Sequence, residues 1–175
     1  MLVTVSGLPG SGTSTVAALI AQHLGVERLD GGTVFRTIAA ERGLALNELS
    51  RLAEVDDRID RALDDRLVER AAKGDVVLES RLAGWLVYNA GLDAHRVWLA
   101  CDEAERAARV GGRDGHATDE AIAVNRAREA SERLRYQQYY GIDLTDLSIY
   151  DQVVDTTTTT VEEVVELVVA AVGAS

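Results

Sequence analysis

The chain has 175 residues, the size of one folded domain, and 47% of them are hydrophobic, which excludes a disordered segment. Its 29 acidic and 18 basic residues give a formal net charge of -11, which excludes a general nucleic-acid coat because phosphate backbones need a basic partner. There is one cysteine, no apolar run that could span a membrane and no basic-then-apolar leader. We therefore expect a cytoplasmic protein without a disulfide and with no membrane or nucleic-acid partner.

Strand-like and helical stretches alternate along the whole chain, with no linker or repeat between them. This alternation predicts one α/β domain over residues 1–175, with a five-stranded parallel sheet and helices on both faces. The expected elements, in order, are a strand at 2–6, a helix at 15–24 that stops at Gly25, a strand at 27–29, helices at 33–42 and 47–73, strands at 75–79 and 96–100, a helix that begins at Asp102, a glycine-rich break at 111–115, a helix at 118–139, a strand at 152–155 and a helix at 161–172.

The strongest functional signal lies between the first strand and the first helix, which is where a phosphate-binding P-loop occurs. Glycines let backbone N–H groups turn inward around a phosphate, and the helix N-terminus adds its positive dipole end. A plain glycine turn is the alternative. The predicted phosphate-binding residues are Gly7, Gly10, Ser11, Gly12, Thr13, Ser14 and Thr15, of which Ser14 stands where the motif's hydroxyl binds Mg²⁺.

One position departs from the P-loop pattern GxxxxGK[ST]: Thr13 stands where lysine is expected. That lysine normally bridges the outer phosphates and follows the charge as it moves. Its absence means either that the loop is degenerate or that arginines elsewhere carry the charge.

Two further segments place an arginine close to a strand end. Asp30, Gly31 and Gly32 open a helix in which Arg36 lies one turn in, and this suits either a second phosphate or an ordinary capped helix. Arg81 follows the strand that ends at Glu79, where ligands collect in a doubly wound sheet. An anion site and a structural salt bridge are both open for Arg81.

Positive charge is concentrated in the 30 residues from 106 to 135 of this acidic chain. Arg128, Glu132 and Arg135 share one helical face, because they are spaced four and seven residues apart. Ion pairs on a solvated helix would explain single members, whereas the whole cluster suggests an anion partner. The arginines are Arg106, Arg109, Arg113, Arg126, Arg128, Arg133 and Arg135.

The sequence resembles the nucleoside monophosphate kinases, and specifically the archaeal type of cytidylate kinase. The resemblance covers about residues 1–170 and rests on four blocks, of which the third and the second part of the fourth are specific. The blocks are GLPGSGTST, GG-T-V-F-R-x-I-A, LESRLAGW, and R-x-R-E-x-S-E-R-x-R-Y followed by YYGIDLTDLSIYD. Members of this type with threonine at the lysine position are known, so Thr13 does not exclude activity.

The resemblance implies a P-loop kinase with an acceptor-binding helical insertion at about residues 30–74 and an arginine-rich lid at about 109–135. It implies ATP and Mg²⁺ as cofactors and a nucleoside monophosphate as substrate. Separately, we expect a monomer. The implied catalytic residues are Arg81, Arg109 and Arg128, the phosphate loop is 7–15 with Ser14 on the metal, and the implied acceptor-binding residues are Asp30, Gly31, Gly32, Arg36, Arg81, Gly84, Trp85, Glu132 and Arg135.

The expected activity is transfer of the ATP γ-phosphoryl group to CMP or dCMP. Two alternatives remain open at this point. The same fold could phosphorylate another nucleotide or a small metabolite, which the unusual Asp30 motivates, or the chain could be a catalytically weak nucleotide-binding regulator, which Thr13 motivates.

Overall fold

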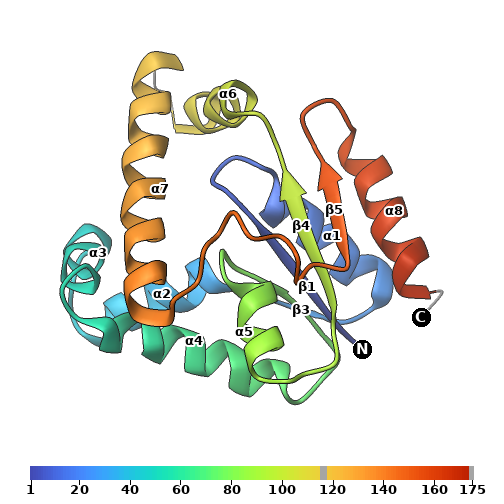
Figure 1. Cartoon of the computed structure of the whole chain (residues 1–175), viewed down its shortest axis with the longest axis horizontal. Coiled ribbons are helices and arrows are strands. Elements are labelled where there is room, and N and C mark those ends of the chain that lie inside the picture. The colour runs from blue at the N-terminus through green and yellow to red at the C-terminus, as the bar shows by residue number, and fades with distance from the viewer. Residues whose placement is uncertain (115–117, 174–175) are drawn as a thin grey trace.

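One parallel sheet organises the molecule, as the sequence predicts (Figure 1). The structure is a computed structural model that describes residues 1–114 and 118–173. Within these residues the strands are hydrogen-bonded in the order β2-β3-β1-β4-β5, all parallel. The strands are β1 Leu2–Gly7, β2 Glu27–Asp30, β3 Val76–Glu79, β4 His95–Ala100 and β5 Gln152–Asp155.

Helices cover both faces of the sheet, which explains why β1 and β3 are buried along their whole length. Helices α1 and α8 pack on one face through Val16, Ile20 and Val168. Helices α4, α5 and α7 pack on the other face through Leu67, Leu86 and Tyr136. The helices are α1 Thr13–Leu24, α2 Gly31–Glu41, α3 Leu46–Ala53, α4 Asp57–Ala71, α5 Ala83–Asn89, α6 Glu103–Asp114, α7 Thr118–Tyr140 and α8 Val161–Gly173.

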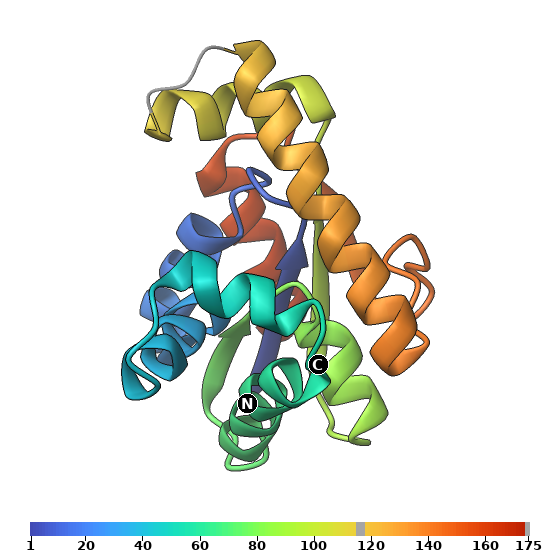
Figure 2. The ribbon, with the colours of Figure 1, turned by 90° about the vertical axis from the view of Figure 1, so that its left-hand side faces the viewer.

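Strand register brings the carboxyl ends of the central strands together. Val5 pairs with Glu79 across β1 and β3, and Gly7 pairs with Leu99 across β1 and β4. The loops that follow these strands therefore meet at one edge of the sheet, which is where α/β folds bind ligands. Figure 2 shows α6 and the first part of α7 lying beyond this edge, above the loop that follows β1.

Two of the expected elements are wrong in detail. The single helix expected at 47–73 is divided into α3 and α4, because Asp56 caps a new helix by accepting a hydrogen bond from the backbone N–H of Arg58 (3.1 Å). A glycine-rich break was expected at 111–115, but residues 111–114 are helical and belong to α6. Residue 115 lies outside the described residues. Helix α5 was not expected at all.

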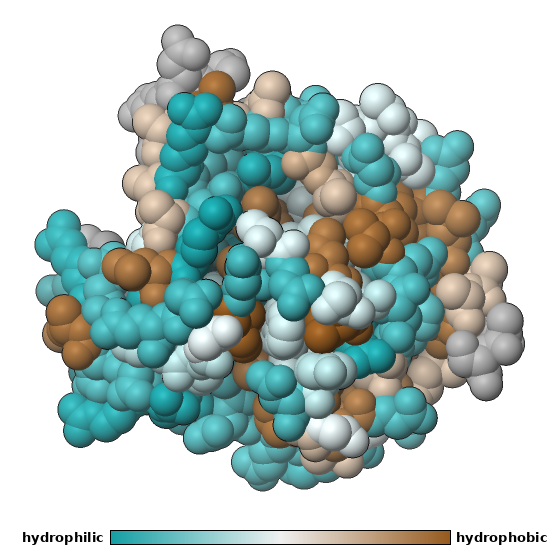
Figure 3. Space-filling model, in the orientation of Figure 1, coloured by the Kyte–Doolittle hydropathy of each residue, from teal (hydrophilic) through white to brown (hydrophobic). Residues whose placement is uncertain are grey.

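Hydrophilic residues dominate the face shown in Figure 3, and hydrophobic ones gather over β5 and α8. Val153 in β5 and Leu167 in α8 are among the exposed large hydrophobic residues. No helix in the described part of the chain is both long enough and apolar enough to cross a membrane.

Candidate active site

The loop between β1 and α1 has the geometry of a phosphate cradle. Gly10 has a φ of 87°, and a Cβ there would lie 2.4 Å from the carbonyl oxygen of Arg106, so the position requires glycine. The loop closes on itself through a hydrogen bond from the Ser11 N–H to the Leu8 carbonyl (3.1 Å), and Thr13, Ser14 and Thr15 form the first turn of α1. The N-terminus of a 12-residue helix therefore lies where the glycine-rich turn ends.

A carboxylate from the neighbouring strand meets this turn. Oε1 of Glu79 accepts hydrogen bonds from the hydroxyl of Thr13 (2.9 Å) and from that of Ser14 (2.7 Å). Oε2 of Glu79 is buried and accepts no hydrogen bond in the described part of the chain, and its nearest charged partner is a guanidinium nitrogen of Arg28 at 3.5 Å. The site thus presents a carboxylate that has unused acceptor capacity beside a hydroxyl.

This donor set fits Mg²⁺. The ion prefers oxygen ligands, and protein sites usually offer only one or two carboxylates while water and substrate phosphates fill the other positions. The hydroxyl of Ser14 and the carboxylate of Glu79 are such oxygens. Among the described residues, no group of three or more His, Cys, Asp or Glu side chains could hold a metal by itself.

Asp30 caps helix α2, which begins at Gly31 rather than at Thr33. Its carboxylate accepts hydrogen bonds from the N–H of Gly32 (2.8 Å) and the hydroxyl of Thr33 (2.6 Å). Burial alone would raise the pKa of Asp30, but these hydrogen bonds and two nearby arginines lower it overall. Arg36 contacts the same cap, with Nη2 at 2.8 Å from the Thr33 hydroxyl and 3.4 Å from Asp30. The capped-helix interpretation of this segment is confirmed; a second phosphate here stays a prediction.

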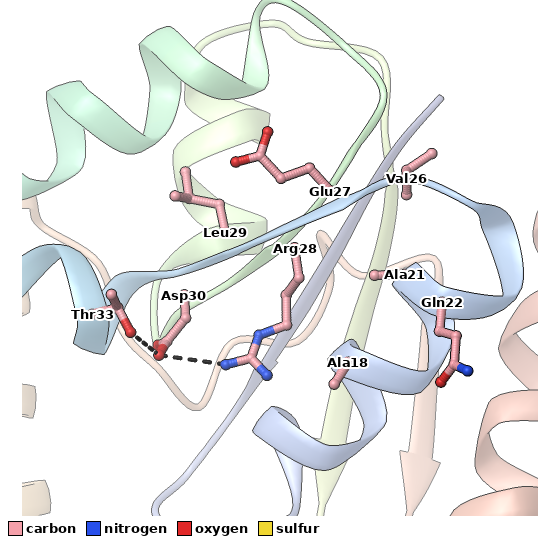
Figure 4. Close-up of a pocket in the computed structure, with 9 residues that line it drawn as sticks. All are labelled: Ala18, Ala21, Gln22, Val26, Glu27, Arg28, Leu29, Asp30 and Thr33. Carbon is pink, nitrogen blue, oxygen red and sulfur yellow. Dashed lines mark hydrogen bonds and ion pairs between the residues drawn. The ribbon is translucent and has the colours of Figure 1, made fainter.

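Arg28, which the sequence analysis did not single out, joins these two parts of the site. Its guanidinium donates to the carbonyl of Ser14 (3.1 Å) and lies 3.4 Å from Asp30 and 3.5 Å from Glu79. Arg28 and Asp30 line an open groove of about 630 Å³ between α1 and β2. Figure 4 shows the two side chains in contact there. Arg28 therefore balances two carboxylates and ties the start of α1 to the start of α2.

Arg81 lies in the turn after β3, at the carboxyl edge of the sheet. Nη1 donates to the carbonyl of Gly7 at the end of β1 (2.9 Å), and Nε donates to Oε2 of Glu132 in α7 (3.0 Å). Oε1 of Glu132 accepts from Arg128 (3.0 Å). Burial would raise the pKa of Glu132, but the charges of Arg81 and Arg128 lower it overall. The structure thus brings Arg81, Arg128 and Glu132 together beside the phosphate loop. The ion pair of Arg81 with Glu132 is observed, and an anion site at Arg81 stays a prediction.

Arg135, one turn further along α7, is paired with a carboxylate that the sequence analysis missed. Its Nη1 lies 2.7 and 2.8 Å from the two oxygens of Asp60 in α4. Burial raises the pKa of Asp60 more than the Arg135 charge lowers it. Next to this pair, Asp64 accepts a hydrogen bond from the hydroxyl of Tyr140, and burial raises the pKa of Asp64 to about 7.

The arginines of α6 contact the loops that follow β1 and β5. Arg106 is buried and donates to the carbonyls of Pro9 (3.2 Å) and Cys101 (3.1 Å), and it pairs with Glu129 of α7. Arg109 donates to the carbonyl of Thr156 (2.7 Å) and pairs with Glu105. It is also close to the phosphate loop, because a Cβ on Gly12 would lie 3.9 Å from it.

Five of the seven arginines between residues 106 and 135 form ion pairs, namely Arg106, Arg109, Arg126, Arg128 and Arg135. Arg109 is partly buried and Arg128 is exposed, whereas Arg126 pairs with Glu103. The side chain of Arg113 lies outside the described residues.

Gly84 and Trp85 belong to α5, directly after the Arg81 turn. The N–H of Gly84 donates to the Ser6 hydroxyl (3.2 Å), and a Cβ on Gly84 would lie 2.4 Å from the ring of Tyr150, so no larger residue fits. Trp85 packs against Tyr88 edge to face, and its indole N–H is buried without an acceptor in the described part of the chain. Trp85 thus has an unused donor beside the site.

Comparisons with known proteins agree on one family. The model of the cytidylate kinase-like family matches residues 2–158. A cytidylate kinase of Haloquadratum walsbyi is 48% identical over 175 residues, with 99% of this chain and 90% of the relative covered. Those of Pyrococcus horikoshii and Methanocaldococcus jannaschii are 44% and 42% identical, with 98% of this chain and 88% and 97% of the relatives covered.

Solved structures show the same fold at low sequence identity. An uncharacterized protein from Eubacterium ventriosum has a TM-score of 0.74 at 14% identity, with 100% of this chain and 99% of that one covered. A gluconokinase from Sinorhizobium meliloti has a TM-score of 0.64 at 19% identity, with 98% of this chain and 91% of that one covered. A shikimate kinase from Bacteroides thetaiotaomicron has a TM-score of 0.64 at 16% identity, with 99% of this chain and 96% of that one covered. The predicted P-loop kinase fold is therefore confirmed.

Proposed function

The chain belongs to the cytidylate kinase-like family, and on that premise we propose that it is a cytidylate kinase, an ATP-dependent phosphotransferase that converts CMP to CDP. The family predicted from the sequence is confirmed. The observation that carries the proposal is the placement of Arg81 between the end of β1 and Glu132, because it sets an anion-binding guanidinium beside a phosphate loop.

On the donor side, residues 7–15 are proposed to hold the phosphates of ATP through backbone N–H groups and the N-terminus of α1. Ser14 and Glu79 would hold Mg²⁺, which supplies neutralisation of the outer phosphates when it is bound. Two observations support this assignment. The hydroxyls of Thr13 and Ser14 each donate a hydrogen bond to Oε1 of Glu79. Oε2 of Glu79 accepts no hydrogen bond in the described part of the chain.

Arginines are proposed to carry the charge that Thr13 does not provide. Three of them donate to carbonyls of the phosphate loop or of the first turn of α1, namely Arg81 to Gly7, Arg106 to Pro9 and Arg28 to Ser14. Three guanidinium groups therefore lie against the loop although the lysine is absent, and each of them is also paired with a carboxylate. This arrangement supports the view that arginines supply the charge that lysine usually provides at position 13, and that the loop is active despite Thr13.

On the acceptor side, the segment 30–74 is proposed to bind the monophosphate. Arg81 and Arg36 are the cations available for its phosphate, with Asp30, Gly31 and Gly32 forming the capped helix start beside them. Gly84, Trp85, Glu132 and Arg135 would contact the nucleoside. In support, α2, α3 and α4 form a unit with a hydrophobic cluster of its own around Ile38, Leu49 and Ile59.

Residues 109–135 are proposed to form a lid that closes on both nucleotides. Arg109 and Arg128 would bind the phosphoryl group during its transfer, and closure would exclude water that otherwise hydrolyses ATP. The solvent exposure of both side chains, partial for Arg109 and larger for Arg128, supports this role, because a solvent-accessible guanidinium can exchange its carboxylate for a phosphate. Positioning and charge neutralisation then supply the rate increase, without a covalent intermediate.

We also propose that dCMP is accepted and that the enzyme acts as a cytoplasmic monomer. A lone cysteine suits a reducing compartment.

A phosphate-transfer assay with ATP, Mg²⁺ and a panel of acceptors tests the proposal. We expect CMP and dCMP to be the best acceptors. Preference for a different nucleotide or for a small metabolite would favour a specialised kinase of the same fold. Binding of nucleotide without any turnover would show a regulator instead.

A further inference from the structure

In the described part of the chain four acidic side chains are buried, namely Asp60, Asp64, Glu79 and Glu132. Glu79 serves the phosphate loop, Glu132 holds two arginines, and Asp64 accepts the hydroxyl of Tyr140. Asp60 contacts neither the phosphate loop nor a tyrosine hydroxyl, and its partner is Arg135. A buried ion pair by itself contributes little to stability.

The Asp60–Arg135 pair is incompletely satisfied. One nitrogen, Nη1 of Arg135, serves both oxygens of Asp60, so each oxygen keeps a free acceptor site. Nε of Arg135 is buried and has no acceptor among the described residues. A strong acceptor and an unused donor therefore lie side by side, which is a pattern that a ligand with a donor next to an acceptor would complete.

The pair lies where the base of the acceptor nucleotide would be read. Arg135 follows Glu132 by three residues and shares its face of α7, so it lies about 4.5 Å further along the helix axis than the residue that contacts Arg81. Asp60 comes from the proposed acceptor segment on the opposite side. A nucleotide whose phosphate is held at Arg81 would thus extend its base toward the pair.

Cytosine matches the pair and uracil does not. The edge of cytosine offers an exocyclic amino donor, which Asp and Glu side chains accept, beside ring acceptors. Uracil carries a carbonyl at the amino position, and this oxygen would face a carboxylate. We propose that Asp60 reads the exocyclic amino group of cytosine, that Arg135 donates to the acceptor atoms next to it, and that the pair makes the enzyme prefer CMP to UMP. This inference rests on the proposed function.

Asp60→Asn tests the inference, with Asp64→Asn as the matched control. Arg135 would draw the amide oxygen of the introduced asparagine toward itself and leave the NH₂ group facing the base, which suits uracil. We expect the ratio of kcat/KM for CMP to that for UMP to fall at least about tenfold in Asp60→Asn. Asp64 is also buried in α4 and bonded to α7, but one turn further from Glu132, so Asp64→Asn should keep the ratio within about twofold.

A CMP analogue without the amino group, pyrimidin-2-one riboside 5′-monophosphate, gives a second readout. Removing this group should lower kcat/KM at least about tenfold in the parent enzyme and not in Asp60→Asn. An equal loss in both enzymes, or an unchanged CMP to UMP ratio, would overturn the inference while the kinase stands. If the parent neither binds nor phosphorylates CMP, the proposed function fails first and this inference with it.

Folding is checked by circular dichroism. If Asp60→Asn does not fold, Asp60→Glu takes its place, because it keeps the charge and displaces the carboxylate. The loss on removing the amino group should then shrink, and an undiminished loss would refute the assignment of Asp60.

Discussion

Replacing Arg81 by alanine is the most direct test of the active site. The side chain is 17% exposed and makes two short hydrogen bonds, to the carbonyl of Gly7 and to the carboxylate of Glu132. Hydrogen bonds that involve a charged group contribute about 1.5–3 kcal/mol each. A hundredfold rate loss corresponds to about 2.7 kcal/mol. Loss of one such contact to the acceptor phosphate therefore predicts a fall in kcat/KM of about 10- to 150-fold, and loss of a bidentate contact predicts a fall of at least about a hundredfold.

The variant should still fold. Glu132 keeps its contact with Arg128, so its charge is not left without a partner, and we expect a loss of about 1–3 kcal/mol in the free energy of unfolding. Arg81→Lys should fall between parent and alanine variant, because lysine keeps the charge but not the planar fork. Urea unfolding and initial rates at varied CMP measure the two effects separately.

Arg96 offers a matched control at the other end of the sheet. It is 21% exposed, is ion-paired with Asp151 and lies near the start of β4, away from the phosphate loop. Arg96→Ala should therefore lower stability and leave kcat/KM within about twofold. A folded, fully active Arg81→Ala variant would show that Arg81 is a structural ion-pair residue. An equal rate loss in Arg96→Ala would show that the assay reports stability instead.

The remaining predictions concern the loop, a buried acid and the lid. Thr13→Lys should leave turnover within about tenfold if arginines already carry the charge, whereas a rise of several orders of magnitude in the same assay would mark the native loop as degenerate. Because the pKa of Asp64 is raised to about 7, the folded state retains a proton that the unfolded chain has lost, so this group lowers the free energy of unfolding as pH rises from about 4 to 7. Asp64→Asn should remove that slope, at most about 4 kcal/mol, in urea titrations at several pH values, and an unchanged pH dependence would refute the buried acid. Hydrogen exchange in α6 should slow when CMP and a non-hydrolysable ATP analogue bind, and more so than in the strands; equal exchange with and without ligands would remove the lid.

Local patterns in the sequence were sufficient for the fold. The strand before the phosphate loop, the glycine that ends α1 at Gly25, and the alternation of elements all act over a few residues, and the structure has them where they were expected. The failures are also local. The cap at Asp56 was overlooked, and Gly111 and Gly112 were taken as breakers although a helix tolerates glycine at about 1 kcal/mol each.

The candidate site was harder to predict, because its contacts join residues that are far apart in the chain. Glu79 meets Ser14 across 65 positions, and Asp60 meets Arg135 across 75. No periodicity or motif links such partners, so Glu79 could be noticed only as a carboxylate beside Arg81, and Asp60 not at all. Arg28 was missed for the same reason, since its three acceptors come from separate elements.

Helix α7 contacts both halves of the site. Toward its N-terminus it pairs with α6 through Arg126 and Glu103, and toward its C-terminus it is tied to α4 through Arg135 and Asp60. A continuous helix of 23 residues transmits a displacement at one end to the other. If ATP and CMP each shift this helix toward the same position, each must raise the affinity for the other by the same factor, because thermodynamic linkage is reciprocal. Synergistic binding of the two nucleotides would then be a property of the scaffold, present before any chemistry occurs.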